Sequence, residues 1–222
     1  MPRIARLIAP GYPHHIVQRG NNREAVFFSR KDRERYLHLL SEAKKEYPCT
    51  VHAYCLMTNH IHLLITPNEA NTLAKIMQKI SLCYTQYVNS AYRRTGRLWE
   101  CRFHSTIIDS NEYFWIVCRY IERNPVRAKI VRKPAVYQWS SAHIHSRQGN
   151  NALVEKLWDE RKRQKEYVDF IDREEPADKL QSIRKALYSG KPLGGKAFLN
   201  DLQKYFGITV NLRAKGRPKK IK

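Results

Sequence analysis

The chain has 222 residues, of which 41 are Lys or Arg and 20 are Asp or Glu, giving a formal net charge of +21 and a pI near 10. Apolar residues make up 42% of the chain, which is enough for a buried core and excludes a wholly disordered protein. Five cysteines without a CxxC pair exclude a disulfide framework and a zinc ribbon, and they indicate the reduced thiols of a cytoplasmic protein.

Secondary structure is predicted from the spacing of apolar residues and from turn residues. In chain order, the first half predicts a strand at 14–19, a helix at 30–46, strands at 50–56 and 60–66 joined by a hairpin turn at 57–59, and a helix at 71–94. A strand at 102–108 follows, and then a helix that Asp109 begins as N-cap, with Glu112 completing a capping box. This helix runs to Arg123, and Pro125 ends or bends it. This order predicts an α+β fold: an antiparallel sheet covered by helices on one side.

The chain changes in character after about residue 149. Residues 152–171 are strongly charged with a helical pattern, shorter helices are predicted at 178–188 and 196–206, and residues 213–222 hold six bases and no acid. We therefore predict a domain at 1–150 and a helical, basic, DNA-binding extension at 151–222 with a disordered end.

The positive charge is spread over both parts. Residues 142–222 hold 19 basic and 10 acidic residues, a net charge of +9, which leaves +12 for residues 1–141. Such a charge favours a polyanionic partner, most often nucleic acid. The sequence offers neither an uncharged apolar run of about 18 residues nor an apolar segment suited to a signal peptide, so no membrane partner is expected.

The triplet His60-Ile61-His62 is the most informative motif of the predicted strands. Residues i and i+2 of a strand point to the same face, so both imidazoles can bind one divalent metal. The alternative is a pair of structural histidines on a polar face of the sheet. A second triplet, His143-Ile144-His145, lies among polar residues without an apolar strand, and we interpret it as an exposed coincidence.

A second group of residues surrounds Tyr120. Tyr120 and Asn124 are four residues apart and share a helix face, and Arg119, Arg123 and Arg127 lie nearby in the sequence. These cations could bind phosphate and assist a phenolate, which a tyrosine needs in order to act as a nucleophile. The alternative is that Tyr120 is one of 13 tyrosines packed at a helix surface, and spacing alone does not single it out.

Four motifs that occur in one order favour a functional role for His60, His62 and Tyr120 over a structural one. They are His14–Asn21, Met57–Leu64, Gly96–Phe103 and Tyr120–Ala128. Together, over roughly residues 2–145, they resemble the REP-associated tyrosine transposases, bacterial relatives of the IS200-like, single-tyrosine HUH transposases. The resemblance implies an HUH nuclease core of the ferredoxin-like type, with a four- or five-stranded antiparallel sheet. It also implies a cytoplasmic, nucleoid-associated enzyme with DNA as its partner.

The same resemblance implies roles for individual residues. Tyr120 would be the catalytic nucleophile, and His60, His62 and Asn124 would bind Mg²⁺ or Mn²⁺. The enzyme would cut single-stranded DNA beside palindromic hairpins, become joined to the 5′ phosphate and release a 3′ hydroxyl, as a monomer or a homodimer. Two alternatives remain: a non-catalytic hairpin-binding regulator on the same fold, and an HUH nickase for replication initiation or transfer.

DNA contacts are expected from cations and an aromatic side chain in four regions. They are Arg3, Arg6, Arg19 and Arg23 near the start; Arg97, Trp99 and Arg102 around Gly96; Arg123 and Arg127 beside Tyr120; and Arg217 and Lys219 in the tail. Residues 215–220 resemble half of an AT-hook, and the alternative is a nonspecific phosphate-binding tail.

Overall fold

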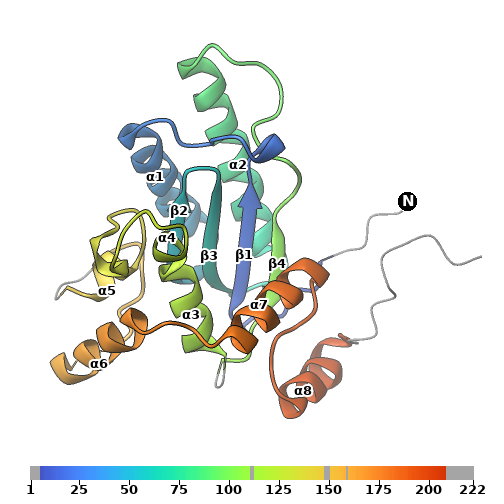
Figure 1. Cartoon of the computed structure of the whole chain (residues 1–222). Coiled ribbons are helices and arrows are strands. Elements are labelled where there is room, and N and C mark those ends of the chain that lie inside the picture. The colour runs from blue at the N-terminus through green and yellow to red at the C-terminus, as the bar shows by residue number, and fades with distance from the viewer. Residues whose placement is uncertain (1–5, 111–112, 148–150, 159, 209–222) are drawn as a thin grey trace, which may run out of the picture.

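The central feature is a four-stranded antiparallel sheet with strand order β2-β3-β1-β4 (Figure 1). The computed structural model describes residues 6–110, 113–147, 151–158 and 160–208. The strands are β1 (His14–Arg19), β2 (Cys49–Met57), β3 (His60–Pro67) and β4 (His104–Ile107). The α+β class and all four strands within this part are confirmed, including the tight turn between β2 and β3.

Helices surround this sheet. They are α1 (Arg30–Glu46), α2 (Thr72–Ala91), α3 (Phe114–Glu122), α4 (Asn124–Arg127), α5 (Ala142–His145), α6 (Arg161–Asp172), α7 (Ala177–Ser189) and α8 (Lys196–Phe206). Short 3₁₀ turns lie at Asn21–Arg23 and Pro134–Val136. Ser29 begins α1 with a capping box that it shares with Asp32. None of the helices within the described residues has the length and apolar character needed to cross a bilayer.

Helices cover both faces of the sheet, so the expectation of one covered face is wrong. Ile61 and Leu63 of β3 belong to a hydrophobic cluster formed with α1 and α2, whereas Leu64 belongs to a second cluster formed with α3, α6 and α7. The second covered face is explained by β2, whose residues from Val51 to Met57 are all buried. A strand buried on both faces carries a near-continuous apolar run rather than a strict alternation.

Two helices begin later than predicted. Asp109 does not cap α3, because its backbone N–H donates to the carbonyl oxygen of Leu193 and keeps this segment extended. The predicted partner of the cap, Glu112, lies outside the described residues. Helix α6 begins at Arg161 because the backbone before it is engaged elsewhere: Glu155 N–H donates to Val51, and Lys44 Nζ donates to the carbonyl of Leu153.

The extension shares the core of the sheet. Tyr167 and Ile171 of α6 and Ile183 of α7 pack in the same cluster as Cys55 and Leu64 of the sheet. In Figure 1, α7 passes in front of the sheet near β1 and β4. The boundary at residue 150 stays a prediction, and residues 209–222, with the AT-hook-like segment, lie outside the described residues.

Buried His14 makes the stability of the fold depend on pH. Its Nδ1–H donates to the carbonyl of Tyr12 at 2.8 Å, and its Nε2 accepts from the N–H of Ala9 at 3.2 Å. Burial lowers the pKa of His14 to about 4, although the bond to Tyr12 opposes the shift. The stabilising neutral form is therefore fully present above pH 6.5 and is lost as the pH falls through 4.

We expect the free energy of unfolding to fall by on the order of 3 kcal/mol from this group alone between pH 6.5 and pH 4. Urea unfolding at a series of pH values measures the slope. His14→Gln should reduce the slope by about 1.4 kcal/mol per pH unit, the value for one proton. Equal slopes for variant and parent would contradict this origin of the pH dependence.

Candidate active site

His60 and His62 lie at the start of β3 and point to the same face of the sheet. Their ring centroids are 5.1 Å apart at 81°. The register pairs Arg19 with His60 and Val17 with His62, so β1 supplies the adjacent edge of the site. The predicted convergence of the two imidazoles is present.

Asn59 fixes the ring of His60. The Asn59 amide donates through Nδ2 to the carbonyl of Arg23 at 2.9 Å, and its Oδ1 accepts from Nδ1 of His60 at 2.7 Å. Because an amide oxygen only accepts, Nδ1 of His60 carries the proton in this arrangement, and Nε2 keeps its lone pair. Burial and the charge of Arg19 lower the pKa of His60 to about 4, and the side chain of Asn124, which favours the protonated ring, opposes this shift.

Tyr120 faces these histidines from α3. It is 7% exposed, and its ring lies edge-on to His62 at a centroid distance of 5.8 Å. Asn124 reaches the same place from α4, because the helix breaks at Arg123 and restarts before Pro125. The Nδ2 atom of Asn124 is buried without a partner among the described residues. The two residues expected to share a helix face therefore share one site.

His15 belongs to the same cluster and was missed by the sequence interpretation. Its Nε2 lies 2.9 Å from Nδ1 of His62, the two rings stack at 5.2 Å, and its ring lies 5.6 Å from that of Tyr120. Burial lowers the pKa of His15 to about 3, and burial together with the neighbouring His15 and His60 lowers that of His62 well below its usual value. All three imidazoles are therefore neutral at pH 7. His15 could have been found from the alternation of side chains along β1, because this alternation places His15 on the same face as Arg19.

The cluster opens into a pocket of about 510 Å³. Its lining residues are Val17, Arg19, Arg23, Asn59, His60, His62, His104, Tyr120, Asn124, Arg184, Leu187 and Tyr188. Within the described part of the chain, three arginines and no Asp or Glu side chain line it. An anion is the complementary ligand for such a pocket.

Arg123 and Arg127 are held by an acidic residue of the extension. Nε of Arg123 lies 2.9 Å from Oε2 of buried Glu175, and Nη1 of Arg127 forms an ion pair with the same carboxylate. Arg123 also donates to the carbonyls of Ile171 and Asp172. The Arg127 guanidinium lies 4.2 Å from the centroid of the Tyr120 ring. Both side chains are thus engaged inside the protein, which gives them a structural role whether or not they contact DNA.

The other predicted DNA contacts are dispersed. Arg19 and Arg23 line the pocket, and Arg97 and Arg102 are exposed. Arg6 stacks over Phe103 at 3.7 Å and donates to its carbonyl. Trp99 is 7% exposed and packs in the core, which leaves little of its ring for stacking on a base. Arg3, Arg217 and Lys219 lie outside the described residues.

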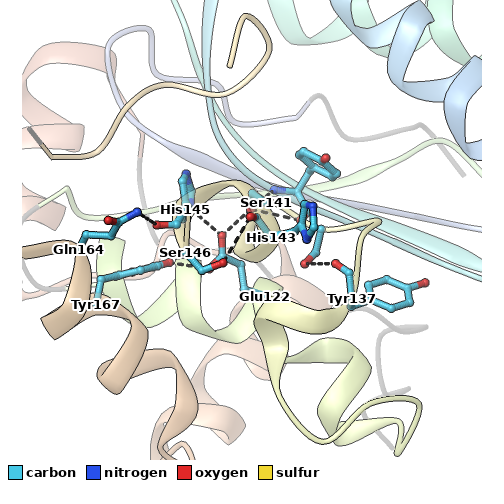
Figure 2. A network of polar contacts seen from close by, with 10 residues as sticks. Glu122, Tyr137, Ser141, His143, His145, Ser146, Gln164 and Tyr167 are labelled. Carbon is cyan, nitrogen blue, oxygen red and sulfur yellow. Dashed lines mark hydrogen bonds and ion pairs between the residues drawn. The ribbon is translucent and has the colours of Figure 1, made fainter. Parts of the chain in front are cut away.

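A buried network of polar side chains around Glu122 holds α3, the tyrosine helix that carries Tyr120 (Figure 2). Glu122 accepts hydrogen bonds from Oγ of Ser141 at 2.5 Å, Nδ1 of His145 at 2.7 Å and the hydroxyl of Tyr167 at 2.8 Å. The carboxylate thereby joins α3 to α5 and α6. The interpretation of the second histidine triplet as an exposed coincidence is wrong for His145, which is 5% exposed.

Comparison with known proteins identifies the family to which the chain belongs. The family model described as "Transposase IS200 like" matches residues 10–124, just over half of the chain, and includes β1, β3, α3 and the four residues His60, His62, Tyr120 and Asn124. The chain belongs to the IS200-like transposase family.

One solved structure agrees with this membership at the level of the fold. The transposase aligns with a REP-associated tyrosine transposase bound to a REP hairpin at 18% identity and a TM-score of 0.53, over 72% of this chain and 92% of that one. A putative transposase from Deinococcus radiodurans aligns at 14% identity and a TM-score of 0.37, over 59% and 95% of the two chains. No curated protein matches the chain significantly. The α7 residues in the pocket of this transposase, Arg184, Leu187 and Tyr188, come after the family-matched segment.

Proposed function

We propose that this IS200-like transposase cuts and rejoins single-stranded DNA through a covalent bond between Tyr120 and a DNA phosphate. The observation that carries the proposal is the placement of Tyr120 opposite His60, His62 and Asn124 in a pocket lined by arginines and no carboxylate among the described residues. Such a pocket suits a phosphodiester and a tyrosine nucleophile.

The proposed step is a transesterification. The Tyr120 oxygen attacks the phosphorus, a Tyr–O–P bond forms and the bond to the 3′ oxygen breaks. The phenol releases a proton, and the departing 3′ oxygen takes one up, so that a 5′-phosphotyrosine and a free 3′ hydroxyl result. The energy of the broken bond is kept in the new ester, and attack by a 3′ hydroxyl reverses the step without ATP. Arg19 and Arg23 would stabilise the charge on the phosphate oxygens.

The donor set fits a divalent ion, Mn²⁺ or Mg²⁺. Asn59 leaves Nε2 of His60 with its lone pair, and the Asn124 amide has a buried unpartnered Nδ2 beside His60 among the described residues. In that part of the chain no three His, Cys, Asp or Glu side chains group as a metal site on their own, so the third protein ligand would be the Asn124 amide oxygen. When bound, the ion would polarise the scissile phosphate. Mixed nitrogen and oxygen ligands accept Mn²⁺ as readily as Mg²⁺.

A DNA hairpin is the substrate that we propose. The solved REP-associated transposase that shares this fold is bound to a REP hairpin. The deciding experiment incubates the protein with labelled single-stranded hairpin DNA and Mn²⁺ or Mg²⁺, then separates the products on a denaturing gel. A labelled adduct that resists denaturation and requires the metal supports the proposal. Tight hairpin binding without an adduct would instead identify a non-catalytic regulator.

His15 should act as a positioning residue for His62 in this site. A metal at Nε2 of His62 requires Nδ1–H to donate to His15, which lies 2.9 Å away. We expect His15→Leu to weaken Mn²⁺ binding by about 10- to 100-fold, the usual cost of losing such a partner. Electron paramagnetic resonance of free Mn²⁺ measures this directly. His15→Gln, which can still hydrogen-bond, should recover part of the affinity, and equal affinity in all three proteins would contradict the role.

A further inference from the structure

One wall of the proposed active site comes from the extension. Arg184, Leu187 and Tyr188 of α7 line the same pocket as His60, His62 and Tyr120. They lie at positions i, i+3 and i+4 of the helix and therefore share one face. Ile183 and Ala186, on another face, are buried in the core and fix the orientation of α7.

Arg184 places an exposed positive charge in this wall. Among the described residues it has no ion pair with a carboxylate, in contrast to Arg123 and Arg127. It lies close enough to Arg127 that its charge adds to the effect of burial in lowering the pKa of Arg127. Cations kept near one another without an acidic group in the pocket are complementary to a bound anion.

Tyr188 adds an aromatic surface at the mouth of the pocket. Its side chain is 78% exposed, although large aromatic groups usually become buried. It lies in the last turn of α7, whose C-cap is Gly190 in the left-handed conformation at φ 72°. An arginine and an exposed aromatic ring one turn apart are the pair that holds single-stranded nucleic acid, through a phosphate and a base face respectively.

We propose that α7 forms a subsite for the DNA strand next to the cleaved phosphate, in which Arg184 binds a backbone phosphate and Tyr188 stacks on the adjoining base. The inference rests on the proposed function for the identity of the ligand. It assigns to the extension a place in the catalytic pocket, in addition to any contact that it makes with the hairpin stem.

Binding is measured in the Tyr120→Phe background, so that the result does not depend on cleavage. A fluorescein-labelled single-stranded hairpin oligonucleotide with flanks on both sides is titrated by anisotropy at several salt concentrations. Arg184→Gln should reduce the slope of log K against log salt by about 0.7, the value for one phosphate contact on a single strand. Lys185→Gln removes the same charge from the next residue, which is exposed and outside the pocket, and it is the matched control. Equal changes for both variants would overturn the assignment of Arg184.

An abasic scan tests Tyr188. One abasic nucleotide is moved along the flanks, and binding is compared between Tyr188→Ala, Tyr188→Phe and the parent. In the parent and in Tyr188→Phe, one position should weaken binding about tenfold when its base is removed, within the range of aromatic stacking. Tyr188→Ala should be insensitive at that position alone. The same pattern in all three proteins would overturn the stacking role, and a missing Tyr120 adduct in the gel assay would count against the proposed function instead.

Discussion

Tyr120→Phe should abolish the covalent protein–DNA adduct while leaving the affinity for hairpin DNA nearly unchanged. The substitution removes only the attacking oxygen, and the ring keeps its edge-on contacts with His15 and His62. We expect the cleavage rate to fall by at least ~10³-fold, because a missing nucleophile has no substitute in the step. The measurement is the fraction of labelled DNA that migrates with the protein on a denaturing gel.

Tyr205→Phe is the matched control, since Tyr205 lies 64% exposed on α8 and outside the pocket. Mass spectrometry of the digested adduct identifies the linked peptide in the parent. A normal adduct yield from Tyr120→Phe, or an adduct mapped to Tyr188, would refute the assignment of the nucleophile.

Glu122→Leu should cause the largest loss of stability among single substitutions near the site. It leaves the donors of His145 and Tyr167 buried without their acceptor, and Ser141 keeps only its longer hydrogen bond to the carbonyl of Tyr54. Each such group costs about 1–3 kcal/mol, so losing both together costs roughly 3–5 kcal/mol. We expect a decrease of that order in the free energy of unfolding, measured by urea titration.

Two further variants separate loss of the network from loss of a charge. Glu174→Leu removes an exposed carboxylate of the neighbouring loop and should leave the stability nearly unchanged. Glu122→Gln keeps one acceptor oxygen and should lose less than Glu122→Leu. If Glu122→Leu unfolds at the same urea concentration as the parent, the network does not stabilise the tyrosine helix.

The local features of the site could be predicted from the sequence. Alternation along a strand places His60 and His62 on one face. The spacing of four residues predicted Asn124 beside Tyr120, and Asn124 reaches that place although the helix breaks between them at Arg123. The polar turn at 57–59 and the apolar runs beside it predict the β2–β3 hairpin, which positions the histidine pair.

The contacts between distant segments could not be predicted in the same way. His15 reaches His62 only through the register of β1 against β3, and no local pattern encodes that register. Trp99 was expected to contact DNA, but in the folded protein it packs in the hydrophobic core against Tyr36 and Tyr84. The same holds for His145, whose partner Glu122 lies 23 residues earlier in the chain.

Glu175, which holds Arg123 and Arg127, also has a consequence for the timing of biosynthesis. It follows Arg127 by 48 residues, so at about 5–20 residues per second the ribosome reaches it roughly 2–10 s after the tyrosine helix has been made. During that interval the two arginines lack their carboxylate, and α7 does not yet exist. A nascent transposase therefore passes through several seconds without the wall of the pocket that Arg184, Leu187 and Tyr188 form in the finished protein.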